Sequence, residues 1–210
     1  MALVYTIAVA VIAYLIGSIN SSILISKAVT GKDIRTSGSG NAGATNMLRT
    51  MGKKYAVITL VIDILKGVVA LLLAKLAINL GAYTSATYIA GVAVVLGHNF
   101  PVFFGFKGGK GVATSLGVVL LLDWKIGLIT LVVALAIMAI SKYVSLGSIT
   151  AAVVFMVLQV IAMAVTDSFD IARLICVLIL GGLLIIRHRA NIVRLANGTE
   201  NKLGAKKKEA

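Results

Sequence analysis

The sequence is poor in the groups that soluble enzymes and metalloproteins use. Its 210 residues include one proline, one cysteine, two histidines and seven acidic residues, and only 13% are charged. The single Cys176 excludes a disulfide within the chain and leaves the redox compartment undecided. Two histidines, one cysteine and scattered carboxylates do not supply the clustered ligands that a metal ion needs. We therefore expect no metal and no cofactor.

Apolar residues make up 60% of the chain, well above the share found in soluble domains. They gather into seven segments, several near the ~20 residues that a helix needs to cross a bilayer. These segments are residues 3–25, 56–80, 82–96, 112–122, 126–140, 148–165 and 171–186. The pattern predicts an all-α, polytopic membrane helical bundle. We expect one transmembrane domain over residues 1–202 and a basic polar tail over residues 203–210.

The net charge of +13 is distributed unevenly along the chain. If the N-terminus lies outside and seven segments cross, 16 of the 20 Lys and Arg residues lie on the inner side with the C-terminus. The outer loops hold only Lys125 and Arg173, and Lys66 and Lys75 lie within a span. This distribution follows the positive-inside rule and places every polar block on the cytoplasmic side. Because cations alternate with spans and form no soluble face, we expect no nucleic acid as a partner.

The segment over residues 112–122 is short. Eleven residues of helix cover roughly 17 Å, less than the hydrocarbon thickness. It begins below the membrane surface in a seven-span arrangement. Alternatively, residues 112–141 form a hairpin that does not cross, which leaves five spans. The sequence does not decide between them.

A glycine- and lysine-rich stretch, Phe106–Gly111, separates two apolar segments. Glycine lets consecutive backbone N–H groups curve around an anion, and the helix predicted from Val112 would point its positive end at the same place. The two lysines, Lys107 and Lys110, add charge. The stretch is not a Walker loop, because Gly111 follows Lys110 where Ser or Thr is needed. We interpret it as a phosphate-binding loop; the alternative is a flexible basic turn at the membrane surface.

A second polar block covers residues 37–49 and is built of glycines, hydroxyls and amides ending at Arg49. Such a run buries no core and exposes many backbone N–H groups. Asn41, Thr45 and Asn46 are residue types that cap helices, which is the simpler interpretation of each. Arg49 lies a helical turn further on and could bind a phosphate or carboxylate with two parallel hydrogen bonds.

Other polar residues lie within or beside the spans. Asp63 and Lys66 are three residues apart, so they share a helix face and are expected to form an ion pair near the site. In the last polar block, His188 and Asn191 lie one helical turn apart among arginines, which suits an anionic ligand. Ser145 lies in a short loop on the same side.

Together, these blocks resemble the bacterial acyl-phosphate-dependent glycerol-3-phosphate acyltransferase family, called PlsY. The similarity covers nearly the whole chain in three motifs in the right order. The matching residues are 37–46 with Arg49, 97–102 with 106–114, Ser145, and 187–192 with Glu200.

The resemblance implies transfer of a fatty acyl chain from acyl phosphate to the sn-1 hydroxyl of glycerol 3-phosphate, an early step of phospholipid synthesis. It implies a multi-pass enzyme of the bacterial cell membrane whose site faces the cytoplasm, with membrane lipid around it. The catalytic residues it implies are Ser39, Arg49, His188 and Asn191. The substrate-binding residues it implies are Gly40, Asn41, Thr45, Lys107, Gly108, Gly109, Lys110, Gly111 and Ser145, and Glu200 is expected to be structural.

Two points stay open. The proton of the attacking hydroxyl passes either to His188 or to a phosphate oxygen of a substrate. No base neighbours Ser39 in sequence, so we expect Ser39 to be a hydrogen-bond partner and not a nucleophile. The rival function is a membrane transporter of organic phosphates, although all polar blocks lie on one side and no inverted repeat is visible.

Overall fold

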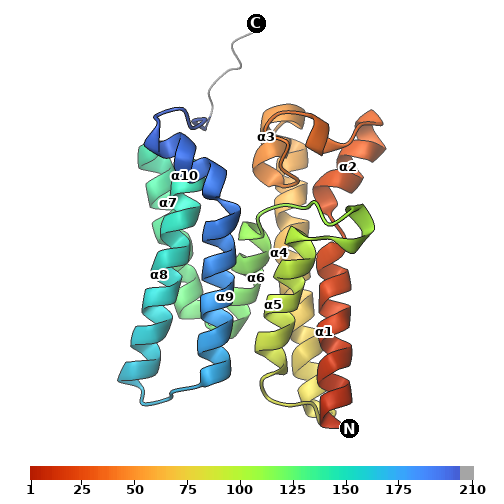
Figure 1. Cartoon of the computed structure of the whole chain (residues 1–210), viewed down its shortest axis with the longest axis vertical. Helices are drawn as coiled ribbons and strands as arrows, with labels where there is room; N and C mark the ends of the chain where they lie inside the picture. The colour runs from red at the N-terminus through yellow and green to blue at the C-terminus, as the bar shows by residue number, and fades with distance from the viewer. Residues whose placement is uncertain (204–210) are drawn as a thin grey trace, which may run out of the picture.

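The computed structural model describes residues 1–203, and within them every regular element is helical (Figure 1). The α-helices are α1 Ala2–Ser18, α2 Ser21–Thr30, α3 Ala44–Met51, α4 Lys53–Asn79, α5 Ala86–Asn99, α6 Val112–Leu122, α7 Trp124–Ser141, α8 Val144–Val165, α9 Ile171–Arg187 and α10 Arg189–Ala196. Two 3₁₀ turns, η1 Ile34–Thr36 and η2 Val102–Phe104, lie in the connections. Most of the expected tail, residues 204–210, lies outside the described residues.

Five helical segments are long and apolar enough to cross a membrane: α1 with α2, α4, α5, α7 and α8. A sixth is obtained if α9 and α10, which meet at a bend of 54°, count as one span. Only 22–44% of the residues in the most apolar windows of the five are buried inside the protein, so most of their side chains face outward, as lipid-facing helices require. The prediction of an all-helical membrane protein is confirmed. The count of seven depends on the short α6 and stays a prediction.

The first predicted segment, residues 3–25, is not one continuous helix. Ile19 and Asn20 adopt extended backbone and separate α1 from α2. The Asn20 side chain accepts a hydrogen bond from the Ile23 N–H at 3.2 Å and so caps α2. The buried Lys66 ammonium on α4 donates to the carbonyls of Gly17 and Ile19 at 3.2 and 3.4 Å. The break is therefore stabilised on both sides: Asn20 caps the start of α2, and Lys66 of α4 binds carbonyls at the end of α1.

The polar elements gather at one end of the bundle, which we call the α3–α10 end. Helices α2, α3 and α10 lie at this end, while the N-terminus and the α4–α5 and α8–α9 connections lie at the other (Figure 1). Helices pack closely where glycines meet backbone: a Cβ on Gly17 would collide with the Val94 carbonyl, and one on Gly67 with the Thr114 carbonyl. Small residues at such crossings are typical of membrane bundles.

Candidate active site

The glycine loop, residues 105–111, is held in place by two arginines from distant parts of the chain. Arg35 Nη1 donates to the carbonyls of Phe104 and Lys107, at 2.8 Å in both cases. Arg187 Nη2 donates to the Gly109 carbonyl at 2.9 Å and to the Gly108 carbonyl at 3.3 Å. The two guanidiniums thus hold three carbonyls of the loop and that of Phe104, the residue before it.

The N–H groups of Gly108 and Gly109 are also occupied. They donate to the carbonyls of Asn99 and His98 at the end of α5, at 3.1 and 3.2 Å. The expectation that consecutive glycine N–H groups curve around an anion is therefore wrong for these two. Their role in this conformation is close packing, because a Cβ on Gly108 would collide with the His98 carbonyl and the Pro101 ring.

The Ser39 loop, residues 37–43, packs against the glycine loop. A Cβ on Gly109 would collide with both the Ala42 carbonyl and the His98 ring, so only glycine fits between them. The two motifs that are about 70 residues apart in sequence thus meet backbone to backbone.

Asn46 fixes the Ser39 loop and caps no helix. The N-cap of α3 is Gly43, and no side chain caps it, which corrects the capping interpretation of Asn41, Thr45 and Asn46. The buried Asn46 side chain accepts from the Ser39 N–H at 2.9 Å and donates to the Ser37 carbonyl at 3.0 Å. Ser39 remains exposed, and within residues 1–203 its hydroxyl has no hydrogen-bond partner.

Glu200 connects the polar block of residues 187–200 to Ser145 and, through Asn191, to Lys110. Glu200 Oε1 accepts from Asn191 Nδ2 at 2.8 Å and from Ser145 Oγ at 3.0 Å. Its Oε2 accepts from Arg194 Nε at 2.7 Å. Lys110 Nζ in turn donates to Asn191 Oδ1. The buried carboxylate therefore orients the side chains that reach toward the glycine loop, in keeping with the structural role expected for it.

Two ionisable groups of this cluster are shifted. Burial lowers the pKa of Lys110 to about 8, with Glu200 opposing the shift and neighbouring arginines adding to it. Burial alone would raise the pKa of Glu200, but hydrogen bonds from Arg194, Asn191 and Ser145 outweigh it and hold that pKa below its usual value. Lys110 is therefore mostly charged at neutral pH and loses its charge in the mildly alkaline range, near pH 8.

His188 and Arg49 differ in exposure. His188 is buried at the junction of α9 and α10, and its Nδ1 lies 2.8 Å from the Leu184 carbonyl. Because a carbonyl only accepts, we assign the proton of the neutral ring to Nδ1, which leaves a lone pair on Nε2. Arg49 is exposed on α3 and reaches the Asn201 carbonyl at 3.5 Å, so α3 approaches the C-terminal segment.

The expected ion pair within α4 is present: Lys66 Nζ lies 3.0 Å from Asp63 Oδ1. Sequence reasoning missed three residues that hold the site, namely Arg35, Arg187 and Asn46. Arg35 carried no signal beyond its charge, whereas Arg187 and Asn46 lie within the matching motifs but were given no role in the site beyond a possible cap at Asn46. Within residues 1–203, no three His, Cys, Asp or Glu side chains lie together in a way that could hold a metal.

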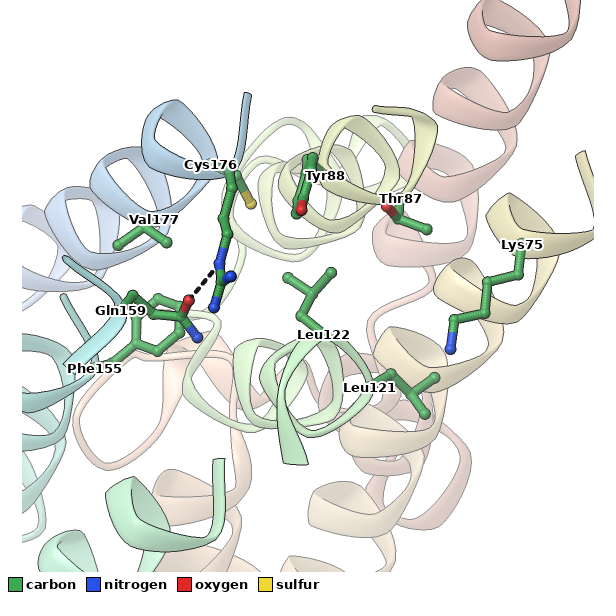
Figure 2. Close-up of a pocket in the computed structure, with 10 residues that line it drawn as sticks. Lys75, Thr87, Tyr88, Leu121, Leu122, Phe155, Gln159, Cys176 and Val177 are labelled. Atoms are coloured by element: carbon green, nitrogen blue, oxygen red, sulfur yellow. Dashed lines mark hydrogen bonds between the residues drawn. The ribbon is translucent and has the colours of Figure 1, made fainter. Parts of the chain in front are cut away.

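A cavity of about 230 Å³ lies away from this site, toward the opposite end of the bundle (Figure 2). It lies among α4, α5, α6, α8 and α9, with Lys75 and Tyr88 on its wall. Arg173 Nε donates to Gln159 Oε1 across one side at 2.8 Å. None of the predicted site residues lines it.

The fold and the site together define an integral membrane protein in which basic and glycine-rich loops gather at one end of a helical bundle. A family model described as glycerol-3-phosphate acyltransferase matches residues 7–198, and the chain belongs to this family. It is 49% identical over 203 residues to the glycerol-3-phosphate acyltransferase of Thermoanaerobacter sp. (strain X514), covering 96% of this chain and 98% of the relative. The Clostridioides difficile (strain 630) enzyme of the same name is 47% identical over 206 residues, covering 96% and 97%.

Two crystal structures of PlsY, an integral membrane glycerol 3-phosphate acyltransferase, have the same fold. The glycerol 3-phosphate form aligns with a TM-score of 0.86 at 41% identity, covering 95% of this chain and 96% of that one. The lysophosphatidic acid form aligns with a TM-score of 0.82 at 40% identity, covering 95% of each. The family resemblance inferred from the motifs is confirmed, and the transporter alternative is not favoured.

Proposed function

We propose that this protein transfers a fatty acyl chain from acyl phosphate to the sn-1 hydroxyl of glycerol 3-phosphate. The hydroxyl oxygen forms a bond to the acyl carbon, and the bond from that carbon to the phosphate oxygen breaks. The hydroxyl proton moves to a base, and the products are 1-acyl-glycerol 3-phosphate and inorganic phosphate. The observation that carries the proposal is the hydrogen bond between Lys110 and Asn191. This bond brings the glycine loop and the polar block of residues 187–200 together just before the N-terminus of α6, and a helix N-terminus favours binding of an anion.

Both reactants carry phosphate, so they repel each other. The phosphate of acyl phosphate is already a good leaving group, which leaves positioning and charge neutralisation as the main tasks. We assign neutralisation to Lys107, Lys110 and Arg49. The remaining contacts to substrate are assigned to Gly40, Asn41, Thr45, Gly111 and Ser145. Gly108 and Gly109, whose N–H groups bond to the end of α5, are assigned to shaping the loop by close packing.

His188 and Asn191 are assigned to the reacting hydroxyl. The Nε2 lone pair of His188 supports this ring as the proton acceptor, with a substrate phosphate oxygen as the alternative. Replacement His188→Gln distinguishes them. If the ring accepts the proton, kcat falls by roughly 10²-fold or more while the KM for glycerol 3-phosphate changes little. A kcat within about threefold of the original would assign the proton to phosphate instead.

Ser39 is assigned as a hydrogen-bond donor to substrate and not as a nucleophile, because in the described residues no base contacts its hydroxyl. Mixing the enzyme with acyl phosphate alone and analysing it by intact mass is expected to show no acyl adduct. An adduct that disappears in Ser39→Ala would reverse the assignment.

The membrane arrangement is part of the proposal. The N-terminus lies outside, seven segments cross the bacterial cell membrane, and the α3–α10 end faces the cytoplasm. Residues 1–202 act as one domain. The sequence-based count, in which 16 of the 20 Lys and Arg residues fall on the inner side, supports this orientation.

The assay that tests the function uses the purified chain with acyl phosphate and glycerol 3-phosphate, scored for phosphate release. Activity is expected without added divalent metal, and none with acyl-CoA as donor. The paired variant Lys107→Met/Lys110→Met should lose activity, and Lys125→Met, at the opposite end, should keep it. Phosphate release that does not depend on glycerol 3-phosphate would contradict the proposal.

A further inference from the structure

Three ionisable side chains lie in contact inside the bundle, directly beneath the glycine loop. Asp63, Lys66 and His98 are 2%, 6% and 3% exposed. Lys66 Nζ lies 3.0 Å from Asp63 Oδ1 and 2.7 Å from His98 Nδ1. Ser21 Oγ donates to the same Asp63 oxygen at 3.0 Å. Buried charges of this kind are costly and usually serve a site.

The contact with Lys66 determines the protonation of the His98 ring. An ammonium group has donors and no acceptor, so Nδ1 must carry the lone pair. The neutral ring therefore carries its proton on Nε2. This assignment follows from the hydrogen-bonding capacity of the partner.

The Nε2 edge of the ring faces the site. A Cβ built on Gly109 would collide with His98 Nε2 and with the Ala42 carbonyl, so this edge lies where the glycine loop and the Ser39 loop meet. The backbone of His98 contributes as well, since its carbonyl accepts the Gly109 N–H at 3.2 Å. His98 thus supports Gly109 with both its ring and its main chain.

We propose that His98, held by Lys66 and Asp63, is a positioning residue that fixes the glycine loop against the Ser39 loop for binding of the phosphate group of glycerol 3-phosphate. The inference rests on the proposed function. A purely structural ion pair would need only Asp63 and Lys66. In this protein His98 joins them, so that the contacts run from the α1–α2 break through Lys66 and His98 to the peptide of Gly109.

The test is kinetic and uses the full-length purified protein. His98→Leu removes the ring nitrogens while keeping an apolar side chain. The KM for glycerol 3-phosphate is expected to rise by roughly tenfold, with kcat within about threefold, because binding geometry is lost and not the chemistry. His98→Gln, whose amide can accept from Lys66 and still present an N–H, should restore the KM to within about threefold.

A second variant keeps the ring and removes its orientation. Asp63→Asn/Lys66→Met eliminates the ammonium without leaving a buried carboxylate unpaired. It should raise the KM in the same direction as His98→Leu. Because it does not alter residue 98, it also covers the case in which His98→Leu fails to fold.

The matched control is Gln159→Met, a buried polar residue at the opposite end, whose KM should equal that of the unaltered protein. If the unaltered protein shows no activity, the proposed function is overturned. If the unaltered protein is active, this inference alone is overturned by either of two results: both test variants keep the original KM for glycerol 3-phosphate, or the KM of His98→Gln is no lower than that of His98→Leu.

Discussion

At the scale of single residues, the site depends on groups whose charge is set by what surrounds them. Lys110 is partly buried, and its ammonium contacts the neutral amide of Asn191, while the Glu200 carboxylate is shared among three other donors. A lysine in this position loses charge at lower pH than a free one. A bound phosphate would restore the charge.

This gives a prediction for pH. Because the pKa of Lys110 is about 8, the charged form is present below that pH and is lost above it. The value of kcat/KM for glycerol 3-phosphate should fall as pH rises through about 8. Lys110→Arg, which stays charged, should move this decline to higher pH. Identical profiles for the two proteins would show that another group causes the decline.

Glu200 gives a prediction for stability. Its carboxylate accepts three side-chain hydrogen bonds, so Glu200→Gln should lower the free energy of unfolding by about 2–3 kcal/mol. Because the folded-state pKa of Glu200 is lowered, this contribution is present above the unfolded pKa and is lost as pH falls through the folded pKa. Thermal unfolding in detergent from neutral to acidic pH measures it. A melting temperature unchanged by Glu200→Gln would contradict the role given to this residue.

At the scale of elements, the glycine loop is a rigid connection between α5 and α6. Its peptide groups are bound on both sides, by the last carbonyls of α5 and by Arg35 and Arg187. Under the proposed function, a loop held in this way would position Lys107 and Lys110 before substrate arrives and so lower the entropic cost of binding.

The loop can be tested at one glycine. Gly108→Ala should raise the KM for glycerol 3-phosphate by roughly tenfold or more, because the added methyl group collides with the His98 carbonyl. Gly182→Ala on α9 is the control, since a methyl group added there would meet nothing within 4 Å, and its kinetics should be unchanged. Equal KM values for both variants would show that the loop yields easily.

At the scale of the whole molecule, the two ends of the bundle differ. The α3–α10 end carries the polar loops and most of the cations, whereas the other end has short turns and the cavity of Figure 2. The α6–α7 turn lies at that second end, tied to α9 by Arg173 and Asp123 at 3.4 Å. If α6 and α7 cross the membrane, this turn reaches the outer surface.

Cysteine labelling tests the arrangement. In a protein whose native Cys176 is replaced by Ala, Lys125→Cys should react with an impermeant thiol reagent added to whole cells. Lys53→Cys, exposed at the α3–α10 end, should react only after the cells are opened. Protection of residue 125 in whole cells would favour the hairpin with residues 112–141 inside.

The sequence alone determined the class of the molecule, because hydrophobicity and charge act locally and are visible in composition. Six predicted apolar segments became helices near their expected bounds, and the motifs led to the right family. The break at Ile19 and Asn20 was not predicted, since the cation that stabilises it comes from Lys66 on another helix. Only the tertiary structure decided which residues hold the site: Arg35 reaches Lys107 and Glu200 reaches Ser145 across 72 and 55 positions. Contacts of that range depend on how helices pack, and periodicity along the chain does not encode the packing partner.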